Sequence, residues 1–592
     1  MNRKTIAHAL SSTVLALGML SVPAFAQEAA PTEADAAASD GDIIVTAQRR
    51  SEKLSDVPIA IVAQTSEQLE RSGIISIKDL GTVTPGLKMT GNGPNSQPAI
   101  RGVSSGQTDP GNDANVATYV DGVYQSSQTA NNAADLADVE RIEVLKGPQG
   151  TLFGRNATGG AIRIVTKKPS YTPTGSVEAS YGNLDEVLVK GYVSAPIIAD
   201  KVAFSLSGVF NDSDGYAYDV VRKEKATGIN NKTGRAKLLI EPTDALSVEL
   251  FASYGKSKDG NAAAYTALKG NSSANFTPGP TVVVPFRANT YTYSTNRDRP
   301  FFTARSWTVG GNISLDTGVG TLTSITAYNN VKSDYNTEGD FSNLDQVYYR
   351  MTQGQKDFSE ELTFATEKFG TLQGTAGVFY YDSTGKYNPL EVDLPAVLPV
   401  PIYVWAQQKT KAYAAFGELN WTPTDQITVI LGARYSSEKR EAASASTFGV
   451  RVQPALTPLG KGQVTYHSFT PRLSVRYDLD SGDNIYATYS KGFKSGGFNI
   501  SAGQADPFKP EKIDAFEVGL KTNTSRMISA NLSAFYYKYK DLQVLAIVNN
   551  FNVTANAATS KIYGADAEIT GHCTPQFSTT GSIAYLQANY DK

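Results

Sequence analysis

The sequence contains very few of the residues from which metal centres and disulfides are built. Among its 592 residues there are one cysteine, Cys573, and three histidines. A single cysteine excludes a disulfide framework and a cysteine-rich zinc or iron–sulfur site. Three histidines leave almost no ligands for a histidine-based metal site. We therefore expect neither a bound metal nor another cofactor.

Long apolar runs and an excess of one charge are also missing. No run of about 18 or more apolar residues occurs, which excludes a multi-pass helical membrane protein. The 54 basic and 57 acidic residues give a net charge of −3, so no basic stripe indicates nucleic acid binding. No Ser/His/Asp triad or carboxylate pair has a recognisable spacing, so we do not expect an enzyme. Glycine (51) and tyrosine (31) are abundant, as in chains with many strands and turns.

The first residues have the features of an export signal. A positively charged start precedes an apolar stretch at 9–22, and Ala24-Phe25-Ala26 matches the small-x-small cleavage pattern. We predict that residues 1–26 are a signal peptide. Residues 27–54 then form a flexible N-terminal segment, which begins with an Ala/Glu/Asp/Pro-rich linker.

The remaining chain divides into two regions of different character. Residues 55–168 mix short apolar runs with Gly/Asn/Pro turns and one helix at Thr65–Arg71, for which we expect Ser66 to be the cap. This pattern predicts an α+β domain of ordinary size. Residues 169–592 contain strand patterns only.

Period-2 alternation recurs through this second region. In residues 202–210, one face holds Val202, Phe204, Leu206, Gly208 and Phe210, and the other holds Ala203, Ser205, Ser207 and Val209. Residues 528–539 alternate in the same way. Such alternation over about ten residues, repeated along the chain, is the signature of a transmembrane β-barrel.

Connector lengths support this interpretation, because short and long connectors alternate. Short ones lie at 241–244, 316–318, 422–425 and 480–483. Long ones lie at 211–229, 256–305, 335–353, 383–406, 438–463, 493–512 and 541–554. Outer-membrane barrels have short periplasmic turns and long external loops. We count about seventeen strands, and since bacterial single-chain barrels have even strand numbers, we expect this sequence to be truncated at its C-terminus.

Several motifs resemble those of one protein family. A short β-prone segment, Asp42-Ile43-Ile44-Val45-Thr46-Ala47, follows the linker and resembles the TonB box of TonB-dependent outer-membrane receptors. Residues 56–58, 100–103, 119–123, 139–148 and 151–162 resemble successive motifs of that family's plug domain. Residues 486–499, 516–521 and 563–568 resemble motifs of its barrel strands.

The resemblance implies a fold and a mechanism. The complete family fold is a transmembrane antiparallel barrel of 22 strands with an α+β plug in its lumen. The plug would be residues 55–168 and the incomplete barrel residues 169–592. The TonB protein would bind residues 42–47, which we call the box segment, by adding that strand to its own sheet edge.

The resemblance also implies a lock between plug and barrel. A buried unpaired charge costs several kcal/mol, so each plug arginine needs a carboxylate. We predict that Arg101, Arg141 and Arg155 pair with Glu517 and Glu568 of the barrel.

Ligand contacts are expected where the plug apices meet the external loops. The candidates are Asn92, Asn95, Gln97, Arg287, Tyr291, Tyr293, Tyr348 and Tyr349. Arginine and tyrosine together suit an anionic, aromatic-bearing ligand.

The resemblance predicts TonB-dependent uptake of a ferric siderophore by a monomer in the lipid of the bacterial outer membrane. The alternatives are uptake of cobalamin, an oligosaccharide or an aromatic compound by the same mechanism, and a passive porin. A plug and an energy handle argue against the porin.

Overall fold

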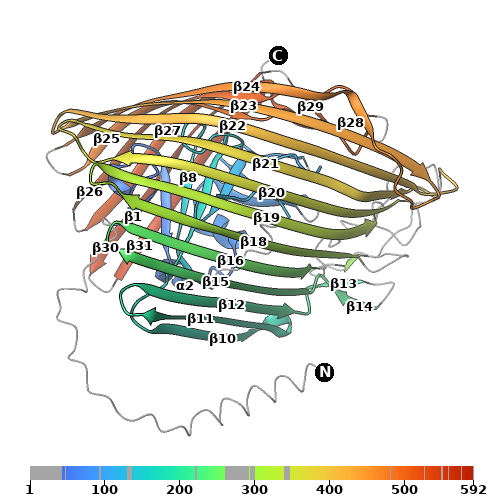
Figure 1. Cartoon of the computed structure of the whole chain (residues 1–592), viewed down its shortest axis with the longest axis horizontal. Coiled ribbons are helices and arrows are strands. Elements are labelled where there is room, and N and C mark those ends of the chain that lie inside the picture. The colour runs from blue at the N-terminus through green and yellow to red at the C-terminus, as the bar shows by residue number, and fades with distance from the viewer. Residues whose placement is uncertain are drawn as a thin grey trace, which may run out of the picture. The chain divides into compact units, whose positions relative to one another are not determined.

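The computed structural model describes most of the chain between Ile43 and Tyr590 (Figure 1). The described residues are 43–46, 48–92, 95–107, 109–129, 137–219, 223–259, 292–293, 300–338, 347–395, 397–479, 482–525, 527–548, 551–557, 559–574 and 577–590. The predicted signal peptide and linker lie outside them, as do four predicted site residues: Asp42, Ala47, Arg287 and Tyr291.

One antiparallel sheet of 17 strands dominates the described chain, in agreement with the number counted in the sequence. Its strands, in order, are β10 (Thr174–Gly182), β11 (Glu186–Ile198), β12 (Val202–Ser213), β15 (Ile229–Thr243), β16 (Leu246–Asp259), β18 (Phe301–Asp316), β19 (Gly320–Glu338), β20 (Tyr348–Thr366), β21 (Leu372–Asp393), β22 (Ile402–Thr424), β23 (Ile427–Phe448), β24 (Thr457–Asp478), β25 (Asn484–Lys494), β26 (Glu511–Ser525), β27 (Ile528–Lys540), β30 (Ser560–Thr574) and β31 (Phe577–Tyr590). Each pairs with the next along the chain, so most contacts within the sheet come from sequential hairpins.

The alternation predicted for 202–210 is found in β12. Ala203, Ser205 and Val209 are buried on the inner face of the sheet, whereas Leu206 on the other face is 49% exposed. An inner face that accepts polar residues and an outer face that stays apolar form the arrangement of a transmembrane barrel.

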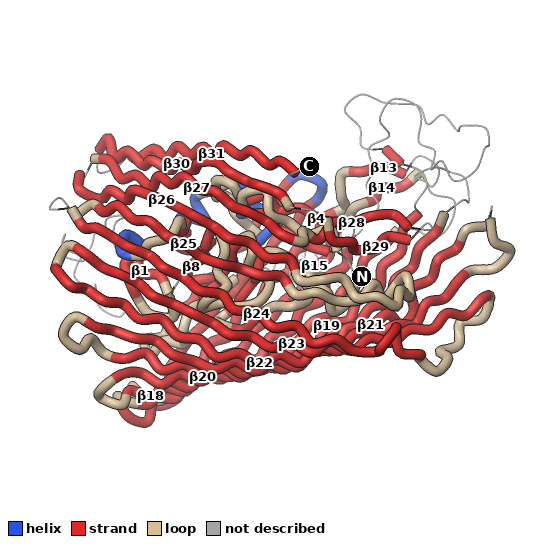
Figure 2. Tube along the Cα trace, turned by 90° about the horizontal axis from the view of Figure 1, so that it is seen from above, coloured by secondary structure: helices blue, strands red, loops and turns tan. Residues whose placement is uncertain are grey.

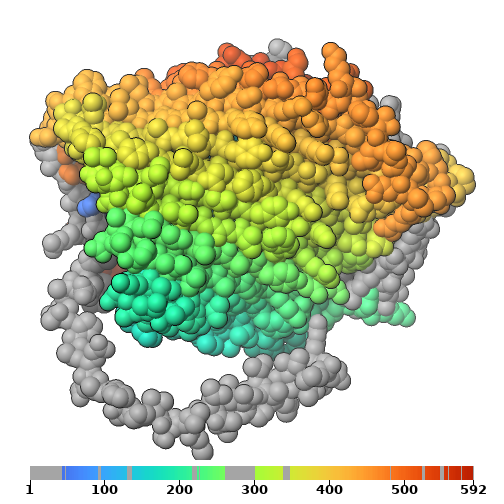
Figure 3. Space-filling view, in the orientation of Figure 1, coloured from blue at the N-terminus to red at the C-terminus, as the bar shows by residue number. Residues whose placement is uncertain are grey.

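The part of the sheet's outward face that Figure 3 shows is continuous, with its strands packed in chain order. Large apolar side chains are exposed on the outward face, among them Trp307, Val309, Ile313, Leu362, Val378, Leu419, Trp421, Leu431, Phe469, Leu473, Ile485, Phe516 and Val518. In water so many exposed apolar groups would be unfavourable, but against lipid they are stabilising.

The strands extend further than the sequence predicts at two of the long connectors. Residues 383–406 and 438–463 were expected to be loops, but β21 to β24 continue well into both. The partners keep pairing there, with Tyr387 opposite Ala406 and Gln408 opposite Ala442, so the backbone groups remain satisfied. Small sheets lie in three other long connectors. β13 (Ala217–Asp219) and β14 (Glu224–Ala226) of one connector form a sheet with β17 (Thr292–Tyr293) of the next, and β28 (Gln543–Val548) pairs with β29 (Phe551–Asn556) in a third.

The plug lies on the inner side of the large sheet, where Figure 2 shows its loops and short helices. Its centre is a mixed sheet of five strands in the order β3 (Ile61–Thr65), β8 (Val139–Lys146), β9 (Gly160–Thr166), β6 (Val116–Val120) and β7 (Val123–Tyr124). A hairpin of β4 (Leu87–Asn92) and β5 (Asn95–Ile100) accompanies it, and a second hairpin joins β1 (Ile44–Val45) to β2 (Glu52–Lys53).

The one α-helix of the described chain, α2 (Ser66–Arg71), is capped one residue earlier than predicted. Thr65, not Ser66, caps it: its Oγ1 accepts from the Gln68 amide (3.4 Å), and the Gln68 side chain accepts from the Thr65 amide (2.9 Å). This reciprocal capping box satisfies two donors that Ser66 is too far into the helix to reach. Three 3₁₀ turns, η2 (Leu54–Asp56), η3 (Ile77–Thr82) and η5 (Asn183–Asp185), complete the helical elements. In this part of the chain no helix is long and apolar enough to cross a membrane.

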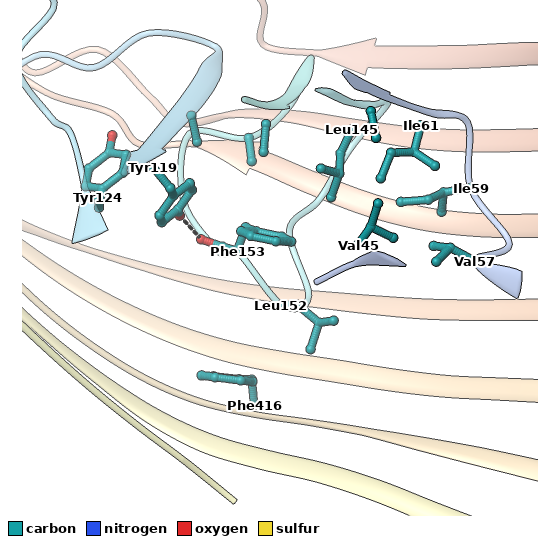
Figure 4. Close-up of a cluster of buried hydrophobic side chains, with 14 of the residues drawn as sticks. Val45, Val57, Ile59, Ile61, Tyr119, Tyr124, Leu145, Leu152, Phe153 and Phe416 are labelled. Carbon is teal, nitrogen blue, oxygen red and sulfur yellow. Dashed lines mark hydrogen bonds between the residues drawn. The ribbon is translucent and has the colours of Figure 1, made fainter. Parts of the chain in front are cut away.

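The core of the plug reaches both the box segment and the barrel wall. Figure 4 shows Val45 among Val57, Ile59 and Leu145, with Phe416 of β22 on the barrel side of the same cluster. Val45 is 0% exposed. The plug, the box segment and one wall of the barrel therefore share a single apolar cluster.

Candidate functional site

Arg101 lies at a tight turn that directs its side chain at the barrel. Ile100 and Val103 exchange backbone hydrogen bonds (3.2 and 2.9 Å), and Arg101 and Gly102 between them have φ values of 51° and 77°. Two successive positive φ values favour glycine at the second position, which is where the sequence has it. The turn therefore projects one long basic side chain from the plug.

The Arg101 guanidinium group is fully enclosed by strands β26, β27 and β30. It donates to Glu517 Oε2 (2.5 Å), Asp566 Oδ2 (2.8 Å), Tyr537 Oη (2.6 Å) and Ser533 Oγ (2.9 Å). Its Cζ also lies 4.1 Å from the ring centroid of Phe535. Burial alone would lower the pKa of Arg101, but Tyr537 and the two carboxylates hold it well above its usual value. The guanidinium group therefore stays charged.

The Glu517 carboxylate binds the plug at a second point. It accepts from the backbone amide of Ala60 (2.9 Å) and from Tyr486 Oη (2.9 Å) as well as from Arg101. Of the predicted lock, this is the pair that the structure brings into direct contact.

Glu568 does not contact Arg101; Asp566 does. Both side chains project from the same face of β30 because they are two residues apart, and Asp566 is the one level with the plug turn. Glu568 is half-buried further along the strand. The predicted pairing of Glu568 with a plug arginine is therefore wrong, and Asp566, within the same sequence motif, was missed.

Arg155 pairs with different carboxylates from those predicted. It contacts Asp113 of the plug (2.7 Å) and Glu438 of β23 (3.3 Å), and Arg440 of β23 also donates to Asp113 (3.0 Å). Arg155 follows the Phe153–Gly154 turn, which faces β23 and not β26. Its predicted partners Glu517 and Glu568 belong to strands elsewhere in the sheet. The lock therefore has a second, separate centre that includes two residues, Glu438 and Arg440, with no motif to mark them.

Arg141 does not reach the barrel. Its side chain contacts Glu140 and Glu143 (2.9 Å) within the plug, because Arg141 and Glu143 project from the same face of β8. Arg163 of β9 contacts Glu143 as well (2.5 Å). The predicted plug–barrel role of Arg141 is therefore wrong, and the cluster serves the box segment instead.

The box segment is docked against this cluster. Thr46 donates from its backbone amide to Glu143 Oε1 (3.0 Å), and Thr46 Oγ1 accepts from Arg163 (2.8 Å). Ile44 and Val45 pair with Lys53 and Glu52 in the β1–β2 hairpin, where Ile44 is 45% exposed. One backbone edge of the box segment is thus already used by the chain itself.

The residues after the box segment attach it to the barrel wall. Arg49 forms a buried ion pair with Glu361 of β20 (2.9 Å), and its guanidinium group lies over the Phe153 ring (4.8 Å). Arg50 donates to Thr375 Oγ1 (2.8 Å) and to backbone carbonyls of β20 and β21. A force applied to the box segment would therefore act on the contacts with the barrel wall as well as on those with the plug.

A small pocket lies at the opposite, outward end of the plug. Its empty space, with the adjoining open solvent counted, is about 320 Å³, and its lining consists of Asn95, Asp109, Pro110, Asn112, Ser127, Gln128, Thr129, Val331, Ser333, Gln353, Gly354 and Gln355. Asp109 is the one charged side chain of this described lining. Burial raises the pKa of Asp109 despite hydrogen bonds from Ser501 and Tyr387. The chemistry here is that of neutral amides and hydroxyls, not of arginine and tyrosine.

The predicted ligand residues are divided by the structure. Asn95 lines the pocket, and Gln97 lies beside it, donating to Gln107 O (2.7 Å). Tyr348 and Tyr349 do not line it: Tyr348 is buried, and Tyr349 packs against an apolar cluster around Tyr387. Asn92 ends β4 and Tyr293 lies in β17, but their side chains are outside the described part of the structure.

The lock predicts that Arg101→Met destabilises the plug by about 3–5 kcal/mol, because two carboxylates remain buried without their partner. Hydrogen exchange of the β8 and β9 amides measures this stability. Arg71→Met, at an exposed arginine of α2, is the matched control and should change it by less than about 0.5 kcal/mol. Equal exchange in the two variants would contradict the assignment.

The docked box segment should also respond to pH. Burial, together with Glu418, raises the pKa of Glu52 to about 7, although Arg50, Arg472 and Arg476 oppose the shift. A raised carboxyl pKa means that the docked state binds the proton more tightly, so docking is strongest at acidic pH and weakens as the pH rises through 7.

A nitroxide at position 44, in a Cys573→Ser background, reports the effect. We expect a severalfold larger mobile fraction at pH 8 than at pH 5. Glu52→Gln should remove this difference, and Glu140→Gln, at an exposed carboxylate, should keep it. A pH response that survives Glu52→Gln would disprove the role of Glu52.

Comparison with known proteins agrees with this architecture. Residues 53–161 match the family model described as TonB-dependent Receptor Plug Domain, and residues 256–592 match TonB dependent receptor-like, beta-barrel. The pesticin receptor of Yersinia pestis is 27% identical over 95% of this chain and 79% of its own length. An iron-regulated outer membrane virulence protein of Vibrio cholerae is 23% identical over 96% and 80%.

The fold itself is matched by a solved structure. The crystal structure of the ferric yersiniabactin uptake receptor from Yersinia pestis superposes with a TM-score of 0.77 at 23% identity, over 90% of this chain and 79% of that one. The predicted combination of a transmembrane antiparallel barrel and an α+β plug is confirmed. With one family model covering more than half of the sequence and a second covering the plug, the chain belongs to the TonB-dependent receptors.

Proposed function

We propose that this receptor actively imports a ferric siderophore across the outer membrane, with energy delivered by the TonB protein. The observation that carries the proposal is the docking of a short β-segment, through Thr46 and Glu143, onto a plug that is itself locked to the barrel by Arg101. The chain thus contains a segment that a partner protein could pull (the box segment, which we also call the handle), a plug that closes the lumen and a barrel around it. A transporter that is opened by an external energy source needs these three parts. The names of the relatives, a ferric yersiniabactin uptake receptor among them, supply the ligand class.

The proposal assigns a role to each predicted region. Residues 27–54 carry the handle, residues 55–168 close the lumen, and residues 169–592 form the wall that contacts lipid. The receptor acts as a monomer. TonB-dependent receptors are transport proteins and not enzymes, and no catalytic step is proposed.

A passive porin does not account for the buried charges. A diffusion pore needs a polar, open lumen, whereas here Arg101 and Arg155 are each buried between plug and barrel with their carboxylates. Placing such pairs out of water is costly and gains little stability over apolar contacts. Such pairs fix the plug in one position inside the barrel, which a pore for free diffusion does not need.

A second candidate ligand has one observation in its favour. The outward pocket is lined by amides, hydroxyls and a carboxylate, which also suit the hydroxyl groups of an oligosaccharide. Uptake would follow the same mechanism, so only the ligand differs.

Uptake assays separate the two ligands. The receptor is expressed in an outer-membrane receptor-deficient strain and given ⁵⁵Fe-ferrioxamine B, ⁵⁵Fe-yersiniabactin or a labelled maltodextrin. We expect iron uptake at least tenfold above the empty vector, abolished by dissipating the proton gradient. Maltodextrin uptake without iron uptake would replace the first proposal by the second. Uptake that continues after the proton gradient has been dissipated would disprove both proposals.

The handle has its own test in Ile44→Pro. Proline removes the backbone donor at the centre of the box segment and prevents a partner strand from pairing there. We expect uptake to fall to the empty-vector level while binding of the labelled ligand to whole cells is retained.

Ile44→Val is the matched control, because it keeps both the donor and the β-propensity and should transport normally. Normal uptake in Ile44→Pro, or loss of ligand binding together with uptake, would show that the segment is not a handle.

A further inference from the structure

The plug is held unevenly by the barrel. Toward β22–β30 it is fixed by both lock centres and by hydrogen bonds at many levels: Lys521 donates to the carbonyls of Leu54 (2.8 Å) and Val57 (2.6 Å), Thr488 to Pro58 (2.9 Å), Asn531 to Ile61 (3.2 Å) and Thr470 to Gly150 (2.9 Å). Toward β12–β20 the interface is interrupted by cavities, although ion pairs occur there too, between Arg49 and Glu361 of β20 (2.9 Å) and between Asp138 and Arg235 of β15 (2.9 Å).

Three cavities follow one another along this second side. The outward pocket is succeeded by a middle cavity of about 850 Å³ between the plug strands β6 and β7 and barrel strands β12–β19. An inward cavity of about 2750 Å³, open to solvent, continues along β15–β21 to the box segment. Val331 lines both the first and the second, and Asp121 lines both the second and the third. The series therefore runs along the plug from its outward end to its inward end.

One turn of the plug separates the middle cavity from the inward cavity. Asp121 and Gly122, with φ values of 49° and 84°, connect β6 to β7, and neighbouring residues line the two cavities. A Cβ at Gly122 would lie 2.7 Å from Ile325 Cδ1, so the turn touches the wall. Asn312 of β18 also donates to the Asp121 carbonyl (3.4 Å). The partition is thus a single hairpin tip.

An ion pair fastens this tip to the wall. Lys237 Nζ of β15 lies 3.1 Å from Asp121 Oδ2, and burial, which would raise the pKa of Asp121, is outweighed by Lys237 and Arg235, so that the pKa is lowered. Each partner has a second contact: Lys237 with Glu249 (3.2 Å), and Asp121 with the amide and hydroxyl of Thr166 (2.8 and 2.7 Å). If the tip withdraws, neither charge is left without a partner.

The free-energy cost of separating the plug from the barrel differs between the β22–β30 side and the β12–β20 side. Withdrawing Arg101 would separate a buried guanidinium group from two carboxylates, of which Glu517 would keep the hydroxyl of Tyr486, and breaking two buried ion pairs at once is strongly unfavourable. Withdrawing the 121–122 tip breaks one ion pair whose members keep other contacts.

We propose that the ligand crosses this protein between the plug and strands β12–β20, and that the Asp121–Gly122 turn is the gate on that route. The plug stays attached to β22–β30 while the tip moves. This inference rests on the proposed transport function and adds the location of the path.

Cross-linking either side of the plug tests the route. In a Cys573→Ser background, Gln125→Cys and Asn329→Cys place thiols on the two walls of the middle cavity; Asn329 donates to the carbonyl of Tyr124 (3.4 Å), so a short, cleavable bis-thiol reagent spans them. The matched control pair is Thr151→Cys with Thr470→Cys, whose native side chains make hydrogen bonds across the fixed side.

We expect the 125–329 cross-link to lower ⁵⁵Fe-ferrioxamine B or ⁵⁵Fe-yersiniabactin uptake at least tenfold, with recovery on reduction and with ligand binding retained. The 151–470 cross-link should leave uptake within twofold. Unchanged uptake with the first cross-link, or loss of uptake with the second, overturns the route. If the reduced variants and the unmodified receptor take up neither iron complex, the proposed function fails instead, and the route with it.

Discussion

The structure depends on the pairing of charges that are enclosed between plug and barrel. Arg101 is 2% exposed and its partners come from three strands of the wall, so the plug turn and those strands must meet in one arrangement. An apolar contact would tolerate sliding, whereas a guanidinium group with two carboxylates does not. The polar inner face of the sheet follows from the same constraint, because it must supply partners wherever the plug presents a charge. The plug in turn needs a core of its own, since its outer surface is committed to these polar contacts.

The handle and the seal are connected through shared residues. Val45 of the box segment is buried in the cluster that includes Phe153 and Phe416, and Arg49 lies over the Phe153 ring while pairing with Glu361 of the wall. Extraction of the box segment together with Arg49 would therefore expose the Val45 side chain and leave the buried carboxylate of Glu361 without this partner. Both effects oppose extraction at rest. A partner that adds a strand must compensate for them with new backbone hydrogen bonds and with the work it delivers.

Sequence patterns predict which face of a strand a residue occupies better than they predict which residues form ion pairs between plug and barrel. Alternation correctly placed Leu206 and Ser205 on opposite faces of β12, and strand counting agreed with the sheet. The pairing of Arg101 with Glu517 followed from family motifs. Arg155 was assigned to the wrong carboxylates, because no periodic signal says which of 17 strands faces a given plug loop. Asp566 was within reach of the same reasoning, since it shares a face of β30 with Glu568.

The uneven attachment of the plug resolves a conflict between sealing and opening. A plug held equally on all sides would have to break every buried ion pair at once, at several kcal/mol each. A plug fixed on one side can keep its register through Arg101 and Glu517 while the other side yields. The contact that opens must then consist of charges that have other partners. Lys237 also contacts Glu249, and Asp121 also accepts a hydrogen bond from Thr166. Which side opens is thus decided by the buried ion pairs that separation breaks, two at Arg101 and one at Asp121, together with the partners that remain after it.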